Sequence, residues 1–289
     1  MNRLIIFLLF ICSVWAVRAQ GVDRVRFNNE ATDTTRITAL LVEASRELPY
    51  SASPQTRMMW FAEKLMSMPY VAGTLDGDEE ILTVNLDGFD CNTFVETVAA
   101  LAMTVGEGRT SWRDFVYNLQ RIRYRKGTVN GYASRLHYVS DWIVDNAYRG
   151  NVKEVTGDYP GVKTLEKTID FMTRHRDKYP ALADSAVYAA MRSVETGYRS
   201  HRFPMIKSSV AGSKDFSGFV HDGDIIAFTT KTPDLDVQHI GFVKHNGTKV
   251  YLLHASSRSG KVEVTDVPLS EYLRRNYNIS GMRIVRLVP

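Results

Sequence analysis

The stretch that most constrains this chain runs from Gly88 to Met103 and reads GFDCNTFVETVAALAM. Asp90 is a typical helix N-cap, because its carboxylate can accept hydrogen bonds from the unpaired N–H groups of a first turn. Apolar side chains then recur at helical spacing, which predicts one face buried against a core. Cys91 therefore stands at the start of a buried helix, where the positive end of the helix dipole favours a thiolate with a depressed pKa.

Two interpretations of Cys91 follow from this placement. A buried structural cysteine is the commoner role for a lone cysteine on an apolar helix. A residue beside the cap is more exposed than one inside the helix, and this favours a nucleophile.

Residues 1–19 have the composition of a cleaved export signal. Arg3 supplies the positive end, residues 4–14 form an apolar run too short to span a bilayer, and Val17-Arg18-Ala19 is a small-residue cleavage pattern. Ile11 precedes Cys12 where a lipidation signal needs a small residue, so we expect no membrane anchor. Cleavage near Ala19 leaves Cys91 as the only cysteine of an exported protein, in the periplasm or outside the cell, and such a residue indicates a reactive thiol.

The length and charge of the chain narrow its class. A chain of 289 residues with 44% hydrophobic content can build one large domain, and we expect a single catalytic domain over residues 20–289. Loss of Arg3 and Arg18 with the signal lowers the formal charge from +4 to +2. Nothing in a charge so near neutral indicates nucleic-acid binding, and we expect a monomer.

The predicted secondary structure changes in kind along the chain. Amphipathic patterns predict helices over residues 35–48, 55–68 and 112–123, and two helices over 163–199 separated at Pro180. A short strand is predicted over 81–86, and later strands over 224–230, 239–244, 250–255, 262–267 and 282–288. Helices followed by antiparallel strands are typical of the α+β class, here with a helical insertion at about 110–200.

A predicted hairpin selects two of the seven histidines as catalytic candidates. Asn246-Gly247 is a strong signal for a two-residue type I′ turn. That turn places His239 directly opposite His254 on one face, with β-carbons roughly 4.5–5.5 Å apart. One imidazole can then take the thiol proton while the other orients it.

A zinc site is the alternative use of these histidines. It would combine His239 and His254 with His245, but His245 lies at the turn and no obvious carboxylate ligand accompanies the three. We therefore expect neither a metal nor another cofactor.

The stretch from Arg121 to Asn146 is rich in arginine and tyrosine. Tyr132, Arg135 and His137 fall in a loop-like part of it and are predicted to form a substrate-binding rim. Aromatic surface suits a sugar ring, and Arg135 suits a substrate carboxylate. The alternatives are a solvated basic face, or a structural ion pair between Arg135 and Asp141.

Several short motifs resemble those of the NlpC-type cysteine peptidases, which are papain-like enzymes of bacterial cell-wall turnover. They are Met68-Pro69-Tyr70, Phe89-Asp90-Cys91, Gly223-Asp224-Ile225-Ile226, His239-Ile240-Gly241 and His254-Ala255. The chain departs from that pattern in Asn92-Thr93, where Ser-Gly is usual, and in its long insertion. DCNTFVETV, SRLHYVSDW and LLHASS are more similar to the N-acetylmuramoyl-L-alanine amidase-like branch of that superfamily.

The resemblance implies a papain-like fold, in which the cysteine helix packs on an antiparallel sheet with added helices. It implies hydrolysis of the amide between muramic acid and L-alanine in peptidoglycan or a released muropeptide. Cys91 would be the nucleophile, His239 the base and His254 its orienting partner, with Tyr70 and Asp90 lining the substrate site. Three alternatives stay open: a stem-peptide endopeptidase of the same fold, a zinc amidase and a non-catalytic wall-binding module.

Overall fold

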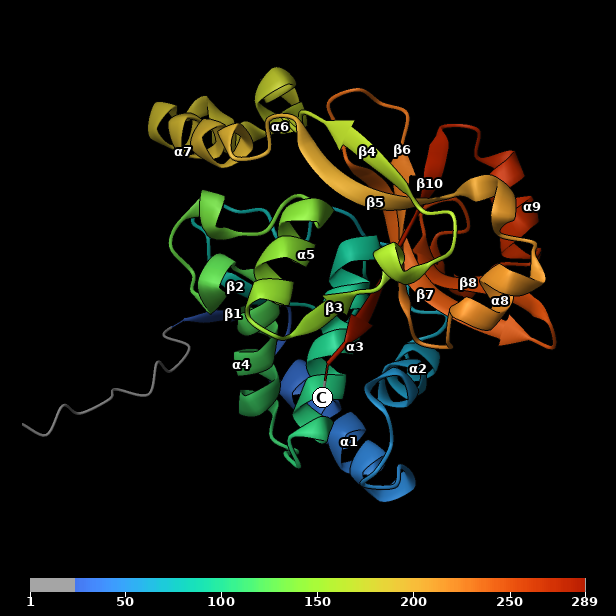
Figure 1. Cartoon of the computed structure of the whole chain (residues 1–289). Coiled ribbons are helices and arrows are strands. Elements are labelled where there is room, and N and C mark those ends of the chain that lie inside the picture. The colour runs from blue at the N-terminus through green and yellow to red at the C-terminus, as the bar shows by residue number, and fades with distance from the viewer. Residues whose placement is uncertain (1–23, 289) are drawn as a thin grey trace, which may run out of the picture.

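A computed structural model describes residues 24–288 of the chain (Figure 1). The predicted export signal, including Cys12, lies outside the described residues. The helices are α1 (Glu30–Glu47), α2 (Pro54–Lys64), α3 (Cys91–Gly106), α4 (Trp112–Arg123), α5 (Val139–Tyr148), α6 (Phe171–Arg174), α7 (Ser185–Thr196), α8 (Lys214–Phe219) and α9 (Leu269–Arg275). Over residues 24–288, no helix combines the length and apolar character needed to cross a membrane.

The strands form one large sheet and one small one. They are β1 (Val25–Phe27), β2 (Leu82–Val84), β3 (Val152–Glu154), β4 (Lys163–Lys167), β5 (His201–Lys207), β6 (Ile225–Thr230), β7 (Val237–Asn246), β8 (Lys249–Ser256), β9 (Lys261–Val264) and β10 (Ile279–Leu287). In the described part of the chain, the large sheet is eight-stranded in the order β4-β5-β10-β6-β7-β8-β9, with β3 also on β10. Its pairs are antiparallel, which confirms the α+β class, while β1 and β2 pair in parallel.

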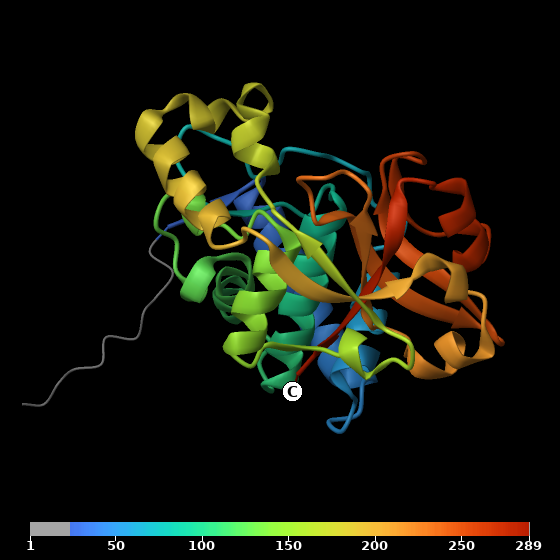
Figure 2. The same cartoon turned by 45° about the horizontal axis from the view of Figure 1, so that its top comes forward.

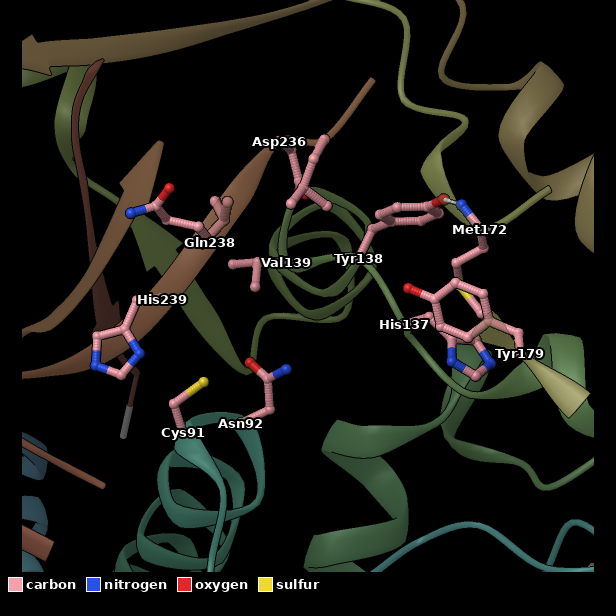
Figure 3. Close-up of a pocket in the computed structure, with 12 residues that line it drawn as sticks. Cys91, Asn92, His137, Tyr138, Val139, Met172, Tyr179, Asp236, Gln238 and His239 are labelled. Carbon is pink, nitrogen blue, oxygen red and sulfur yellow. Dashed lines mark hydrogen bonds between the residues drawn. The ribbon is translucent and has the colours of Figure 1, made fainter. Parts of the chain in front are cut away.

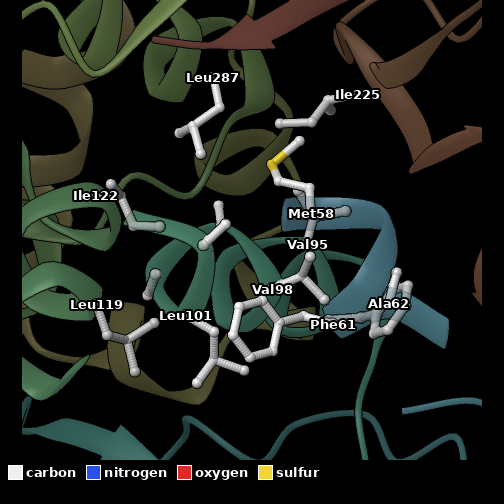
Figure 4. Close-up of a cluster of buried hydrophobic side chains, with 14 of the residues drawn as sticks. Met58, Phe61, Ala62, Val95, Val98, Leu101, Leu119, Ile122, Ile225 and Leu287 are labelled. Atoms are coloured by element: carbon white, nitrogen blue, oxygen red, sulfur yellow. The ribbon is translucent and has the colours of Figure 1, made fainter. Parts of the chain in front are cut away.

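Helix α3 lies at the centre of the molecule (Figure 2). It packs against α1, α2 and α4 and against strands β7 and β8. Its apolar face, with Val95, Val98 and Leu101, meets Met58 and Phe61 of α2, as Figure 4 shows. Each such side chain contributes roughly 1.5–3 kcal/mol when it is fully buried. The core therefore fixes α3 in place, and α3 fixes Cys91 at its first residue.

The early helices and late strands match the prediction closely, whereas the insertion differs from it. The first of the two helices predicted over 163–199 is wrong over most of its length, because Lys163–Lys167 is strand β4 paired with β5 and only Phe171–Arg174 is α-helical before Pro180. Four of the five residues of β4 are charged or polar, which suits an exposed edge strand, and pairing with a distant segment overrides local helix propensity. Helix α5 follows the loop-like part of the insertion and was not predicted, so the insertion mixes helices and strands.

Candidate active site

Asp90 caps helix α3 as predicted. Its Oδ1 accepts a hydrogen bond from the Thr93 backbone N–H at 2.7 Å and one from Thr93 Oγ1 at 2.8 Å. Thr93 Oγ1 in turn accepts from the Asp90 backbone N–H at 2.9 Å, which completes a capping box. The half-buried Cys91 is thereby held at the first position of the helix.

His239 and His254 form a directly bonded pair. His239 Nε2 lies 2.6 Å from His254 Nδ1, and the two rings meet edge to face. The predicted register is wrong, because Asn246 pairs with Lys249 and the turn consists of Gly247 and Thr248. Gly247 has a φ of 59°, the positive value that a type II′ turn needs at its first central residue. The strands are therefore shifted by two residues from the predicted pairing.

The shift by two keeps both histidines on one face but makes them diagonal neighbours. Continuing the observed register places Gly241 opposite His254. A β-carbon on Gly241 would lie 2.9 Å from the His254 β-carbon. The absence of a side chain at Gly241 therefore leaves room for His254 beside β7, and diagonal pairs are within reach of such rings.

The proton positions of this pair follow from its geometry. In Figure 3, the ring nitrogen of His239 that is not used by His254 faces the side of Cys91. For that nitrogen to accept the thiol proton, a neutral His239 must carry its hydrogen on Nε2 and donate it to His254 Nδ1. His254 then serves as a hydrogen-bond acceptor, and it can do so only while it is neutral.

The resting site is uncharged, contrary to the predicted thiolate. Burial, followed by the Asp90 carboxylate, raises the pKa of the Cys91 thiol to about 12. Backbone N–H groups of Ile240, Asn92 and Cys91 stabilise the thiolate, but they do not offset those two effects. Burial also lowers the pKa of His239 to about 3, with a further contribution from His254, and lowers that of His254 to about 4.

Aromatic rings enclose the histidine pair. Phe228 stacks on His239 with the ring planes 8° apart, and Tyr272 of α9 meets both Phe228 and His254. Burial and the nearby Cys91 raise the pKa of Tyr272 to about 12. Tyr272 was not predicted, because a short helix far along the chain carries no local signal of nearness to Cys91.

Tyr70 lies near Cys91, and its place in the substrate site stays a prediction. Its backbone bridges to Phe89, the residue before the helix cap. Burial, the Cys91 thiol and the Asp90 carboxylate all raise the pKa of Tyr70. Its hydroxyl therefore belongs to the surroundings of the nucleophile.

Two cavities that share lining residues lie beside the start of helix α3, and the smaller one is lined by Cys91. The inner chamber has a volume of about 140 Å³ and is lined by Cys91, Asn92, His137, Tyr138, Val139, Met172, Tyr179, Leu235, Asp236, Val237, Gln238 and His239. The outer cleft has a volume of about 490 Å³ and is lined by Gly73, Leu75, Asp76, Gly77, Asp78, Glu80, Asp90, Asn92, Thr93, Glu96, Tyr132, Arg135, Leu136, His137, Lys178, Tyr179, Pro180 and Ala181. Asn92, His137 and Tyr179 line both. The insertion thus lines the same cavity as Cys91, and its role in substrate binding stays a prediction.

Arg135 lines the outer cleft, but its charge is paired. The guanidinium contacts Asp76 at 3.2 Å and Glu80 at 3.5 Å, and it lies over the Tyr132 ring. The suggested ion pair with Asp141 is wrong, because Asp141 accepts from Arg125 and from the Tyr198 hydroxyl. Carboxylates far from Arg135 in the sequence therefore hold it in place.

The zinc alternative requires His245 beside the histidine pair. Instead, His245 Nδ1 lies 2.6 Å from Asp222, and its Nε2 lies 3.0 Å from the Ser217 carbonyl oxygen. Among residues 24–288, no group of three histidine, cysteine, aspartate or glutamate side chains is placed to hold a metal ion.

The family profile described as N-acetylmuramoyl-L-alanine amidase-like matches residues 61–282. The chain belongs to the N-acetylmuramoyl-L-alanine amidase-like family. This is an amidase-like family of cell-wall hydrolases, so the family indicates hydrolysis of a peptidoglycan substrate. No curated protein matches the sequence.

Solved structures of similar chains agree with this family. An N-acetylmuramoyl-L-alanine amidase from Bacteroides uniformis is 38% identical with a TM-score of 0.76, covering 80% of this chain and 99% of its own. A putative xylanase from Bacteroides fragilis is 36% identical with a TM-score of 0.74, covering 78% and 98%. A protein from Legionella pneumophila, 21% identical with a TM-score of 0.67 and covering 90% and 97%, shares the fold.

Proposed function

We propose that this member of the amidase-like family is an exported, papain-like cysteine amidase of the NlpC type. It hydrolyses the amide between N-acetylmuramic acid and the L-alanine of a stem peptide. The observation that carries the proposal is the bonded pair His239–His254 beside Cys91, the first residue of helix α3.

The reaction starts from a neutral thiol and a neutral imidazole. The Cys91 sulfur attacks the lactyl carbonyl while the thiol proton passes to His239 Nδ1. The tetrahedral intermediate collapses to a thioester as His239 returns that proton to the leaving alanine amine. Water, deprotonated by His239, then releases the muramoyl carboxylate and restores the thiol. His254 accepts from His239 Nε2 throughout and stabilises the transient imidazolium.

The start of α3 supplies donors for the charge that develops on the carbonyl oxygen. Backbone N–H groups of Cys91, Asn92 and Ile240 lie close enough to stabilise a negative sulfur, and the Tyr70 hydroxyl belongs to the same surroundings. Donors fixed in this way stabilise an oxyanion without reorganising during the reaction. A raised thiol pKa is consistent with this scheme, because the thiolate forms only as attack proceeds.

Product analysis on a defined muropeptide tests the proposal. Mass spectrometry should detect free N-acetylmuramic acid and an intact stem peptide. A stem-peptide endopeptidase would instead release a cut peptide from the muropeptide. A glycosidase would release reducing ends in a parallel assay with xylan. Loss of activity with a chelator, together with full activity in a Cys91→Ala variant, would indicate the zinc alternative. An absence of free N-acetylmuramic acid would contradict the proposal.

A further inference from the structure

His137 lines both the inner chamber and the outer cleft, as Asn92 and Tyr179 also do. It follows the turn Tyr132–Ser134 closely and is held against that turn. His137 Nε2 lies 2.9 Å from the Tyr132 carbonyl oxygen, and the two rings lie with centroids 4.4 Å apart. The ring is therefore fixed in one orientation beside the nucleophile chamber.

This contact decides which nitrogen of His137 carries the hydrogen. A carbonyl oxygen only accepts, so Nε2 must be the protonated nitrogen. Burial, and then the Arg135 guanidinium, lower the pKa of His137 to about 3, so the ring is neutral. Its Nδ1 consequently presents a bare lone pair. Within residues 24–288, no protein group donates a hydrogen bond to this atom. The atom is not fully buried, so a substrate group can reach it.

Asn92 makes this shared lining complementary to a particular chemical group. Its side-chain amide offers both donors and an acceptor, whereas His137 Nδ1 offers only an acceptor. Together they can bind the N–H and the C=O of a secondary amide. A carboxylate would find no donor at His137.

Building on the proposed function, we propose that His137 is a specificity residue that accepts a hydrogen bond from a secondary-amide N–H of the substrate. Two such groups flank the scissile bond: the acetamido group of the muramoyl residue and the peptide N–H that follows L-alanine. A substrate without the matching N–H leaves Nδ1 unpaired. Loss of a partner for a buried polar group lowers kcat/KM by about 10- to 100-fold.

The experiment compares three substrates with purified wild-type enzyme. The parent is N-acetylmuramoyl-L-alanyl-D-isoglutamine. One analogue replaces the acetamido N–H with oxygen, and the other replaces the N–H after L-alanine with oxygen. We expect kcat/KM for one analogue to be about 10- to 100-fold lower than for the parent. The analogue that is affected shows which N–H donates to His137. Equal kcat/KM for all three substrates would overturn the proposal without any variant being needed.

Variants then assign the effect to His137. His137→Phe should remove the discrimination, so that parent and analogue differ by less than about threefold, while His137→Asn, which keeps an acceptor near Nδ1, should retain part of it. His221→Phe, at an exposed turn, is the matched control and should keep the full ratio. Full discrimination in a folded His137→Phe variant would also overturn the proposal. Release of N-acetylmuramic acid from the parent by wild type tests the proposed function separately.

Discussion

The hairpin of β7 and β8 and the insertion at about residues 110–200 both line the space beside Cys91, but they are built differently. The hairpin places its histidines through backbone pairing, so that a shift of two residues still leaves them on the same face. The insertion places its side chains through long-range polar contacts, such as that of Arg135 with Asp76. We therefore expect changes in the hairpin to act on kcat and changes in the insertion to act on KM or stability.

The largest effect in this comparison is expected for His239→Ala. This variant removes the proposed acceptor of the thiol proton, and kcat should fall on the order of 10³-fold. KM and the melting temperature should change little. Stopped-flow or discontinuous assays with a defined muropeptide measure the loss. A tenfold loss or less would remove His239 from the role of base.

His254 should matter less than His239, because it acts only through that residue. We expect His254→Ala to lower kcat on the order of 10²-fold, and His254→Gln, which keeps an acceptor, to retain measurable turnover. The difference between the two variants reports the orienting hydrogen bond. Equal and complete loss in both would show that His254 does more than orient His239.

The raised pKa of the Cys91 thiol predicts how the rate of its alkylation depends on pH. With the thiol pKa raised to about 12, iodoacetamide should modify Cys91 at pH 7 at least roughly tenfold more slowly than it modifies an unstructured cysteine peptide. The rate should still be rising at pH 10, because deprotonation is incomplete there. Faster alkylation than in the peptide would demonstrate a preformed thiolate.

Burial of three histidines makes the stability of the fold depend on pH. His239, His254 and His137 have lowered pKa values in the folded state, so the unfolded chain binds more protons below its ordinary histidine pKa of about 6.5. Stability is therefore full above that pH and is lost as the pH falls toward about 3 to 4. Thermal unfolding between pH 7 and pH 4 measures this loss, and a melting temperature independent of pH would contradict it.

The smallest effect is expected for Arg135→Lys. Lysine lacks the planar guanidinium that contacts Glu80 and lies over the Tyr132 ring, so Glu80 is left poorly paired. The free energy of unfolding should fall by about 1–3 kcal/mol with little change in kcat. Arg202→Lys is the matched control, because Arg202 forms an exposed pair with Glu166 and should change stability by less than about 0.5 kcal/mol. An unchanged melting temperature with a raised KM would make Arg135 a substrate-binding residue.

The sequence predicted those parts of the molecule that depend on local chemistry. The Asp90 cap, the start of α3 and the strands around His239 and His254 all follow from short-range patterns. The hairpin register was missed because Asn246-Gly247 and Gly247-Thr248 are both acceptable turns, and packing chooses between them. Strand β4 and Tyr272 were missed because their partners lie far away in the sequence. The same reason explains the wrong partner for Arg135.

The alanine variant of Cys91 tests most directly whether Cys91 is the nucleophile. Cys91→Ala should keep its melting temperature, because the side chain is half-buried and small. Its single-turnover rate of N-acetylmuramic acid release should be lower than that of wild type by about 10⁴-fold or more. A folded Cys91→Ala enzyme that releases the sugar within tenfold of the wild-type rate would show that Cys91 is not the nucleophile.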